Sequence, residues 1–238
     1  MNLTGTSIFD PVLCEVVYNW FCPSGGIVLD PFAGGSVRGI TAELLGRRYI
    51  GIDLSQKQVD ANQTNADKLS VCPAWHCDDS RNMDDYIPDG AADLVFSCPP
   101  YHNLERYSDH PLDLSNMNYS DFLIAYEDII SKACRKLKEN RFAVFVVGDI
   151  RDSKGAYRGF VGGTRRFFQD AGLHFYNDMV LLTQYGTAPM RAGIQFSAKR
   201  KAAKVHQNVL VFYKGNMEAI KETFVDDFRW ADLEKIKK

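Results

Sequence analysis

The sequence predicts an α/β protein with a doubly wound, mostly parallel sheet. Apolar runs that read as buried strands alternate with runs of helical spacing along most of the chain, a pattern typical of this class. The first such strand, residues 27–30, leads into a Gly pair where a helix should begin, and the next ends on a carboxylate. With 238 residues, 45% of them apolar, the chain is long enough for one sizeable domain.

The N-terminal half gives three strand and helix pairs. Residues 7–21 have apolar side chains at helical spacing, with Asp10 as the N-cap and Pro11 at the first helical position. Strand 27–30 is followed by a helix that Gly46 closes, and the strand after it ends at Asp53. A polar helix begins after Ser55, and a third strand within residues 71–82 leads to an acidic turn.

The C-terminal half continues the alternation. Residues 92–97 read as a buried strand, and residues 119–138 as an amphipathic helix with Ser120 as its cap. A strand over 141–150 and a helix over 160–172 follow, and strands over 176–184 and 207–213 complete the sheet.

The Gly pair and the carboxylate after the second strand predict a small-molecule site. Gly34 and Gly35 allow backbone N–H groups to approach a ligand closely, because glycine has no Cβ. Asp53 lies about 20 residues further on, where an acid can accept both hydroxyls of a ribose. The full G-x-G-x-x-G is lacking, so a nicotinamide cofactor is not the natural inference, and an ordinary tight turn is the alternative.

A second motif, Cys98-Pro99-Pro100-Tyr101, follows the strand over residues 92–97. Neither proline can donate to a strand ladder, so the strand stops there and its carbonyls point into the crevice at the carboxyl ends of the strands. Hydrogen-bond acceptors beside an aromatic face suit the amino group of a base.

These two motifs together resemble those of the amino-directed (N6-adenine or N4-cytosine) DNA methyltransferases that use S-adenosyl-L-methionine. The cofactor motif of the family looks like Asp30 to Ser36, and its catalytic motif looks like Cys98 to Tyr101. The likeness covers roughly residues 9–213. It implies a Rossmann-like domain with a seven-stranded sheet and a terminal antiparallel strand, and a base that is flipped out of double-stranded DNA.

The resemblance also implies roles for individual residues. Asp79, or else Asp78, would accept from the adenine amino group of the cofactor, and Phe9 and Asp10 would lie near its methionine end. The alternative for Asp79 is an ordinary exposed aspartate in a turn. The full set expected to bind the cofactor is Phe9, Asp10, Asp30, Pro31, Phe32, Ala33, Gly34, Gly35, Ser36, Asp53, Leu54, Asp78 and Asp79.

The catalytic set implied by the resemblance is Ser97, Cys98, Pro99, Pro100 and Tyr101. Cys98 stands where the family has Asp, Asn or Ser, and a thiol is a weak acceptor, so the role of acceptor stays with Cys98 or passes to Ser97 or to backbone carbonyls. Cys for Ser is the smaller change, and Ser is the pattern more often associated with N4-cytosine, which favours cytosine slightly. Attack of the Cys98 thiolate on ring C6 of a pyrimidine is a further alternative.

No Asp or Glu occurs from residue 179 through 216, whereas several cations do. Such a run in a chain of balanced charge predicts a surface that contacts phosphates, with an ordinary basic loop as the alternative. The residues expected to bind DNA are Arg191, Lys199, Arg200, Lys201 and Lys204.

Composition and length predict the charge character, the location and the domain bounds of the protein. The formal net charge of −2 gives no overall nucleic-acid signature, and the absence of a leader or an apolar span predicts a cytoplasmic protein. Five of the six cysteines read as small buried residues, and no spacing predicts a metal site. We expect a methyltransferase domain over 1–215, with a basic insert at 185–206, and a tail over 216–238.

Other functions stay open at this point. A methyltransferase acting on RNA or on a protein amide carries similar P-P-Y turns. A non-catalytic subunit that binds the cofactor or DNA is thinkable because of Cys98. Only the long loop over residues 102–118 and residues 185–206 are available to read a target sequence, which predicts a short or loosely defined target site, or help from a homodimer or a specificity partner.

Overall fold

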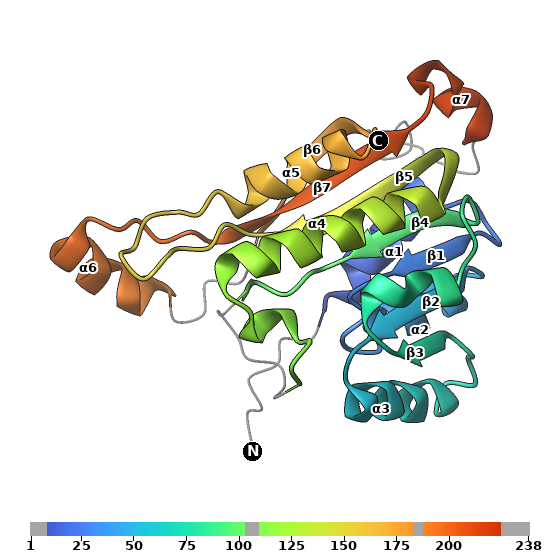
Figure 1. Cartoon of the computed structure of the whole chain (residues 1–238), viewed down its shortest axis with the longest axis horizontal. Coiled ribbons are helices and arrows are strands. Elements are labelled where there is room, and N and C mark those ends of the chain that lie inside the picture. Colours follow the sequence, from blue (N-terminus) through green and yellow to red (C-terminus); the bar gives the residue numbers. More distant parts are fainter. Residues whose placement is uncertain (1–8, 103–109, 183–187, 225–238) are drawn as a thin grey trace, which may run out of the picture.

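The computed structural model describes residues 9–102, 110–182 and 188–224. Its centre is a seven-stranded sheet with the order β3-β2-β1-β4-β5-β7-β6 (Figure 1). Only β7 runs against its neighbours, which confirms the predicted fold class. The strands are β1 (Ile27–Asp30), β2 (Arg48–Asp53), β3 (Ala74–Cys77), β4 (Ala92–Ser97), β5 (Leu137–Val147), β6 (His174–Leu182) and β7 (His206–Lys214).

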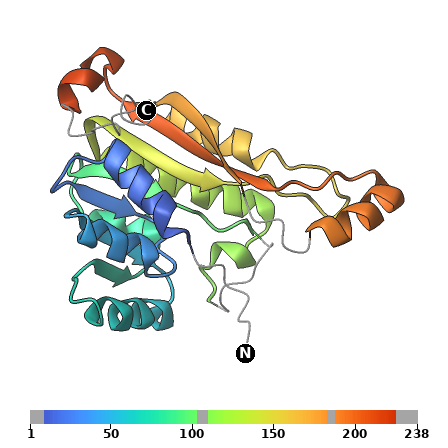
Figure 2. The ribbon, with the colours of Figure 1, turned by 180° about the vertical axis from the view of Figure 1, so that it is seen from behind.

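Helices cover both faces of the sheet (Figures 1 and 2). Each face of the sheet carries an apolar cluster, because successive side chains of a strand point to opposite faces. In β5, Val144 packs in the cluster with residues of α1, α2 and α3, and Phe145 packs in the cluster with residues of α4 and α5. The helices are α1 (Pro11–Phe21), α2 (Val37–Leu44), α3 (Gln56–Asp67), α4 (Tyr119–Lys136), α5 (Phe160–Asp170), α6 (Ala188–Lys199) and α7 (Ile220–Thr223), with short 3-10 turns η1 (Ser80–Asp85), η3 (Leu114–Asn116) and η4 (Met217–Ala219).

Capping residues set where the helices begin. Asp10 accepts from the Val12 N–H at the start of α1, as predicted, and Ser55 caps α3. The predicted cap of α4 is wrong: Asn118 accepts from the Asp121 N–H, and Ser120 lies inside the helix. Both residue types cap well, so sequence alone could not choose the register.

Three further expectations are corrected. β5 begins at Leu137 rather than at 141, because Leu137 pairs with Ala92 of β4 directly after α4 ends. The basic insert contains helix α6, which the low helix propensity of its Gly and Ser residues concealed. Cys72 and Cys77 are exposed rather than buried, since Cys72 precedes β3 and Cys77 ends it, and β3 is an edge strand of the sheet.

The order of the strands fixes where a ligand can bind. The strand order reverses between β1 and β4, and in open sheets of this kind ligands bind at the carboxyl ends of the strands at that point. Because β7 is antiparallel, the connection between β6 and β7 leaves from the same edge, with Leu182 paired to His206. Helix α6 lies in this connection, at the opposite end of the long β6 and β7 pair from α7 (Figure 1).

The described part of the tail packs on the sheet. The Phe224 ring lies 5.1 Å from the Phe142 ring, and the Arg141 guanidinium is 5.8 Å from its centre. Residues 225–238, with Phe228 and Trp230, lie outside the described residues. Within the described part of the chain, no helix is both long and apolar enough to cross a membrane.

Candidate active site

The carboxylate of Asp30 is the centre of a buried hydrogen-bond network at the end of β1. Asp30 has no solvent exposure. Its Oδ2 accepts from Arg38 Nε at 2.6 Å and from the Tyr49 hydroxyl at 2.7 Å. Burial alone would lower the pKa of Arg38, but the Asp30 carboxylate outweighs burial and raises it above its ordinary value. Asp30 therefore supports the predicted cofactor motif from inside the protein.

Ser97 connects this network to the end of β4. Its Oγ donates to Asp30 Oδ1 at 2.5 Å and accepts from the Phe32 N–H at 3.2 Å. Ser97 is fully buried, so its hydroxyl faces the cofactor motif. The Ser97 side chain, which directly precedes the Cys98 to Tyr101 turn, is thereby joined to Asp30 of the predicted cofactor motif.

The turn at Gly34 and Gly35 is open toward the crevice. Gly34 has a φ of +50°, which glycine adopts without strain. A Cβ on Gly35 would meet no atom within 4 Å, so a ligand has room to approach the backbone. The Gly34 N–H donates to Asp53 Oδ2 at 2.8 Å, and Asn62 Nδ2 donates to the Gly34 carbonyl at 2.7 Å. These two bonds hold the turn in place. On either side of it, Pro31 and Ala33 are buried, while Phe32 and Ser36 are half-buried.

Asp53 keeps acceptor capacity beyond these bonds. Its Oδ1 accepts from the Ser55 N–H at 2.8 Å, so each oxygen carries one backbone donor, and an ionised carboxylate offers about four acceptor positions. Burial raises the pKa of Asp53 above its ordinary value, and the hydrogen bonds from Ser55 and Gly34 act against this rise. Asp53 and Leu54 are both half-buried, so part of each stays exposed.

The two acids after β3 lie beside Asp53. The Asp78 N–H donates to the Asp53 carbonyl at 3.1 Å. Asp78 Oδ2 accepts from the Tyr86 hydroxyl at 2.8 Å, and Asp79 caps η1 and binds the Arg81 guanidinium at 2.5 Å. Both acids are half-buried, and the choice of Asp79 over Asp78 as a cofactor contact stays a prediction.

Phe9 lies against the network, whereas Asp10 faces outward. The Arg38 guanidinium is 4.6 Å from the centre of the Phe9 ring, and Phe9 meets the Phe96 ring edge-on at 5.8 Å. Asp10 is exposed, and its side chain caps α1. The two predicted contacts with the methionine end of the cofactor therefore differ in surroundings, and neither is tested by the structure.

The turn from Cys98 to Tyr101 follows β4 directly. Pro99 is buried, and Cys98, Pro100 and Tyr101 are half-buried. Cys98 Sγ lies 4.0 Å from the Tyr101 hydroxyl oxygen, and Gln207 Nε2 donates to that oxygen at 2.5 Å. Burial, and next the neighbouring Cys98, raise the pKa of Tyr101 far above its ordinary value, so the phenol stays protonated at neutral pH.

The sequence analysis missed three residues at this site. Gln207 of β7 fixes the Tyr101 hydroxyl, and only the folded sheet brings them together. His102 is buried with a φ of +49°, and its Nε2 lies 3.0 Å from the Met117 carbonyl. Arg38 could have been noticed, because it lies one helical turn before the buried Ala42.

The predicted DNA-contacting residues lie in and after α6. Lys199 and Arg200 are exposed, and Lys201 and Lys204 are half-buried. Arg191 belongs to α6, but its side chain lies outside the described residues, as do residues 103–109 after the Cys98 to Tyr101 turn. All five positions belong to the connection that leaves from the carboxyl edge of the sheet.

The fold is similar to that of several solved methyltransferases. One is a TehB-like S-adenosylmethionine-dependent methyltransferase from Corynebacterium glutamicum (TM-score 0.52, 17% identity, 88% of this chain and 90% of that one). TrmN from Thermus thermophilus has a TM-score of 0.58 at 16% identity, over 89% of this chain and 51% of that one. An rRNA methylase from Streptococcus thermophilus has a TM-score of 0.54 at 11% identity, over 89% and 100%.

One region of the sequence matches a protein family. A family model described as DNA methylase matches residues 12–64, which confirms the resemblance there and includes Gly34 and Asp53. The match ends before Cys98. An uncharacterised protein of Methanocaldococcus jannaschii is 27% identical over 120 residues, which are 42% of this chain and 55% of that protein. The match thus spans about half the length of that relative. The predicted cofactor is confirmed at the level of fold class and family model.

Proposed function

We propose that the chain transfers a methyl group from S-adenosyl-L-methionine to the exocyclic amino group of a base in double-stranded DNA. The observation that carries this proposal is the link between the two motifs. The Cys98 to Tyr101 turn lies at the carboxyl end of β4, and the Ser97 hydroxyl ties it to Asp30 of the cofactor motif at 2.5 Å. A methyl donor held at β1 and an amine held at β4 would then meet between neighbouring strands.

The residues at the end of β1 and β2 fit the cofactor. The open space at Gly35 admits a ligand against the backbone, and the remaining acceptor positions of Asp53 suit the two ribose hydroxyls. Leu54 and the acids Asp78 and Asp79 lie next to Asp53 along the same edge. When bound, the cofactor supplies a methyl group that is already electrophilic, so the protein has to position the amine and exclude water.

On the side of the base, the chain offers acceptors and an aromatic ring. An exocyclic amine is a poor nucleophile because its lone pair is delocalised into the ring of the base. Acceptors for its hydrogens, here Cys98 Sγ and the Pro99 carbonyl, would favour the pyramidal nitrogen of the transition state. The Tyr101 ring would stack on a flipped base, a contact worth about 1–3 kcal/mol. Gln207 would fix the ring for that contact.

Cytosine N4 is the preferred target over adenine N6. Cys98 replaces Ser with little change of shape, and Ser at this position is the pattern that the resembled family associates with cytosine. The Ser97 hydroxyl is engaged with Asp30 and Phe32, so we assign Ser97 a positioning role. DNA is preferred as substrate because the family model that matches residues 12–64 is one of DNA methylases, and because the acid-free segment leaves from the same edge as the catalytic turn.

The test is methyl transfer from labelled cofactor to mixed-sequence duplex DNA, followed by mass spectrometry of the nucleosides. Wild type should form N4-methylcytosine. Tyr101→Ala should lose most of the product, whereas Tyr101→Phe keeps the ring and should retain it. Cofactor binding by both variants is the control for folding.

Two results would overturn the proposal in different ways. Formation of 5-methylcytosine would show that Cys98 attacks the ring as a thiolate. Absence of methylated DNA, with cofactor still bound, would move the search to RNA, a protein amide, or a subunit that serves a catalytic partner.

A further inference from the structure

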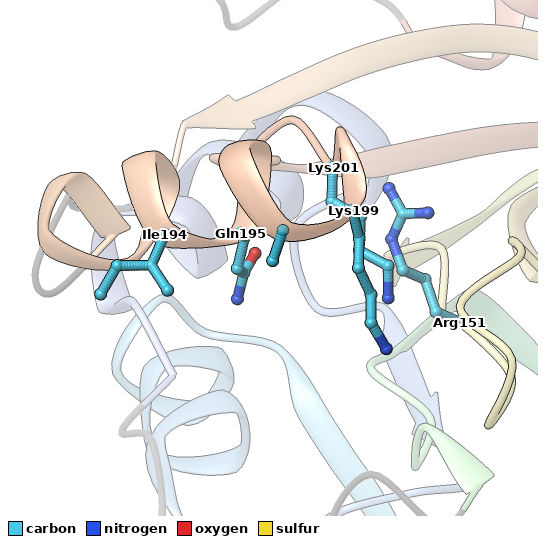
Figure 3. A pocket seen from close by; sticks show the side chains of 6 residues that line it. Arg151, Ile194, Gln195, Lys199 and Lys201 are labelled. Atoms are coloured by element: carbon cyan, nitrogen blue, oxygen red, sulfur yellow. The ribbon is translucent and has the colours of Figure 1, made fainter.

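A pocket of about 310 Å³ lies between α6 and the loop that follows β5 (Figure 3). The lining includes Arg151 from the loop, and Lys199 and Lys201 from the end of α6 and the segment after it. The remaining lining residues are Ile194, Gln195 and Ala198 of α6. Arg151 and the two lysines gather at one end of the pocket (Figure 3).

The guanidinium of Arg151 is held in place by its own loop. Arg151 Nη1 donates to the Gly155 carbonyl at 2.8 Å, and its guanidinium carbon lies 3.7 Å from the centre of the Tyr157 ring. Arg151 also pairs with Tyr157 as an isolated antiparallel bridge. The cation at this end of the pocket is thus fixed by backbone, by a carbonyl and by an aromatic face, and not by an acid.

Lys201 approaches the same point from the other side. Its Nζ lies beside Gly155, in the space that a Cβ on Gly155 would need. Within residues 9–102, 110–182 and 188–224, no carboxylate forms an ion pair with Arg151, Lys199 or Lys201. Three like charges around one pocket repel each other, and a bound anion would relieve that repulsion.

We propose that this pocket holds one backbone phosphate of the nucleic-acid substrate. The inference rests on the proposed function and deepens it, because it replaces a diffuse basic surface by one fixed phosphate site that includes Arg151. A nucleic acid fits better than a small free anion for two reasons. All of its lining residues except Arg151 belong to a segment without any acid from residue 179 through 216, and its apolar walls at Ile194 and Ala198 suit a sugar beside the phosphate.

The pocket is also linked to the catalytic turn. Lys201 precedes β7 by a few residues, and Gln207 near the start of β7 donates to Tyr101. A phosphate held at Arg151 and Lys201 would therefore set the position of the strand relative to the ring that receives the flipped base. Phosphate contacts of this kind fix register without reading sequence.

The test is the salt dependence of binding, without cofactor, between about 50 and 200 mM salt. A fluorescent mixed-sequence duplex of about 30 base pairs would be titrated with wild type and with the variant Arg151→Gln, Lys199→Gln, Lys201→Gln. Loss of one phosphate contact makes the plot of log affinity against log salt concentration less steep by about 0.9. The ratio of the wild-type affinity to the variant affinity therefore changes by about 3.5-fold between the two salt concentrations. We expect that single-contact change.

Two outcomes would overturn the inference. An unchanged salt slope would mean that the pocket contacts no phosphate. If the ratio of wild-type to variant affinity changes by about 40-fold over the same salt range, the three cations contact three separate phosphates. The double variant Lys199→Gln, Lys201→Gln keeps Arg151 and its loop contacts. It provides a second measurement in case the triple variant misfolds. Lys68→Gln is the matched control, because Lys68 is an exposed lysine at the end of α3.

The binding measurement does not depend on methyl transfer. The proposed methyltransferase function and the proposed phosphate site can therefore be refuted separately. A protein that shows the single-contact change but methylates no base would refute the proposed function alone. A protein that methylates DNA with an unchanged slope in the variant would refute the pocket alone. Stronger binding of an RNA duplex, with the same change in slope, would keep the phosphate site and refute DNA as the substrate.

Discussion

Replacement of Arg38 by methionine should destabilise the fold far more than a typical Arg substitution. Asp30 would stay buried with hydrogen bonds from Tyr49, Ser97 and the Phe32 N–H, but without the cation at 2.6 Å. Removing one partner of a buried ion pair costs about 3–5 kcal/mol, because the other charge is left uncompensated. In a domain of this size that corresponds to a fall in Tm of about 6–20 °C.

Urea unfolding followed by circular dichroism would measure the change in the free energy of unfolding. The matched control is Arg166→Met, which breaks the exposed pair with Asp170 at 3.2 Å and should cost less than about 1 kcal/mol. Arg38 also donates to the Phe32 and Ala33 carbonyls, so the variant should bind the cofactor more weakly. Equal costs for the two variants would show that the Asp30 network does not stabilise the fold as argued here.

Three further outcomes follow from particular residues. Gly39→Ala should cost about 1–3 kcal/mol in thermal unfolding, because its Cβ would lie 2.6 Å from the Trp75 ring, whereas Gly163→Ala in α5 meets no atom and should gain about 0.5–1 kcal/mol. Calorimetric cofactor affinity should fall as the pH drops through the raised pKa of Asp53, since the ionised carboxylate accepts the hydroxyls; Asp53→Asn should remove this dependence. Iodoacetamide should label exposed Cys72 in the native protein and spare buried thiols, and labelling of all six at one rate would contradict the packing.

Much of the fold could be predicted because local signals and the global order agree. Asp10 and Pro11 mark the start of α1, and the acid at the end of β2 is where the spacing from the Gly pair places it. The family model matches the region that contains the predicted cofactor motif, residues 12–64. These features depend on residues close together in the chain, for which capping and periodicity are direct evidence.

The contacts that were missed depend on partners far apart in the sequence. Ser97 belongs to the predicted catalytic set, but only the pairing of β1 with β4 turns its hydroxyl toward Asp30. Gln207 meets Tyr101 across 106 positions of the sequence. The pocket at Arg151 likewise joins a loop after β5 to α6, and no spacing along the chain could have revealed it.

The Ser97 to Asp30 bond also bears on how the site would keep its geometry. β1 and β4 are hydrogen-bonded neighbours, with Leu29 paired to Val95, so a shift of one motif against the other would break a buried bond to a charged group, at about 1.5–3 kcal/mol. Methyl transfer needs the reacting atoms about 3–3.5 Å apart and in line. Under the proposed function, two adjacent strand ends joined by their own side chains would keep the two motifs at a fixed separation, and the loops beyond them would serve recognition of the substrate.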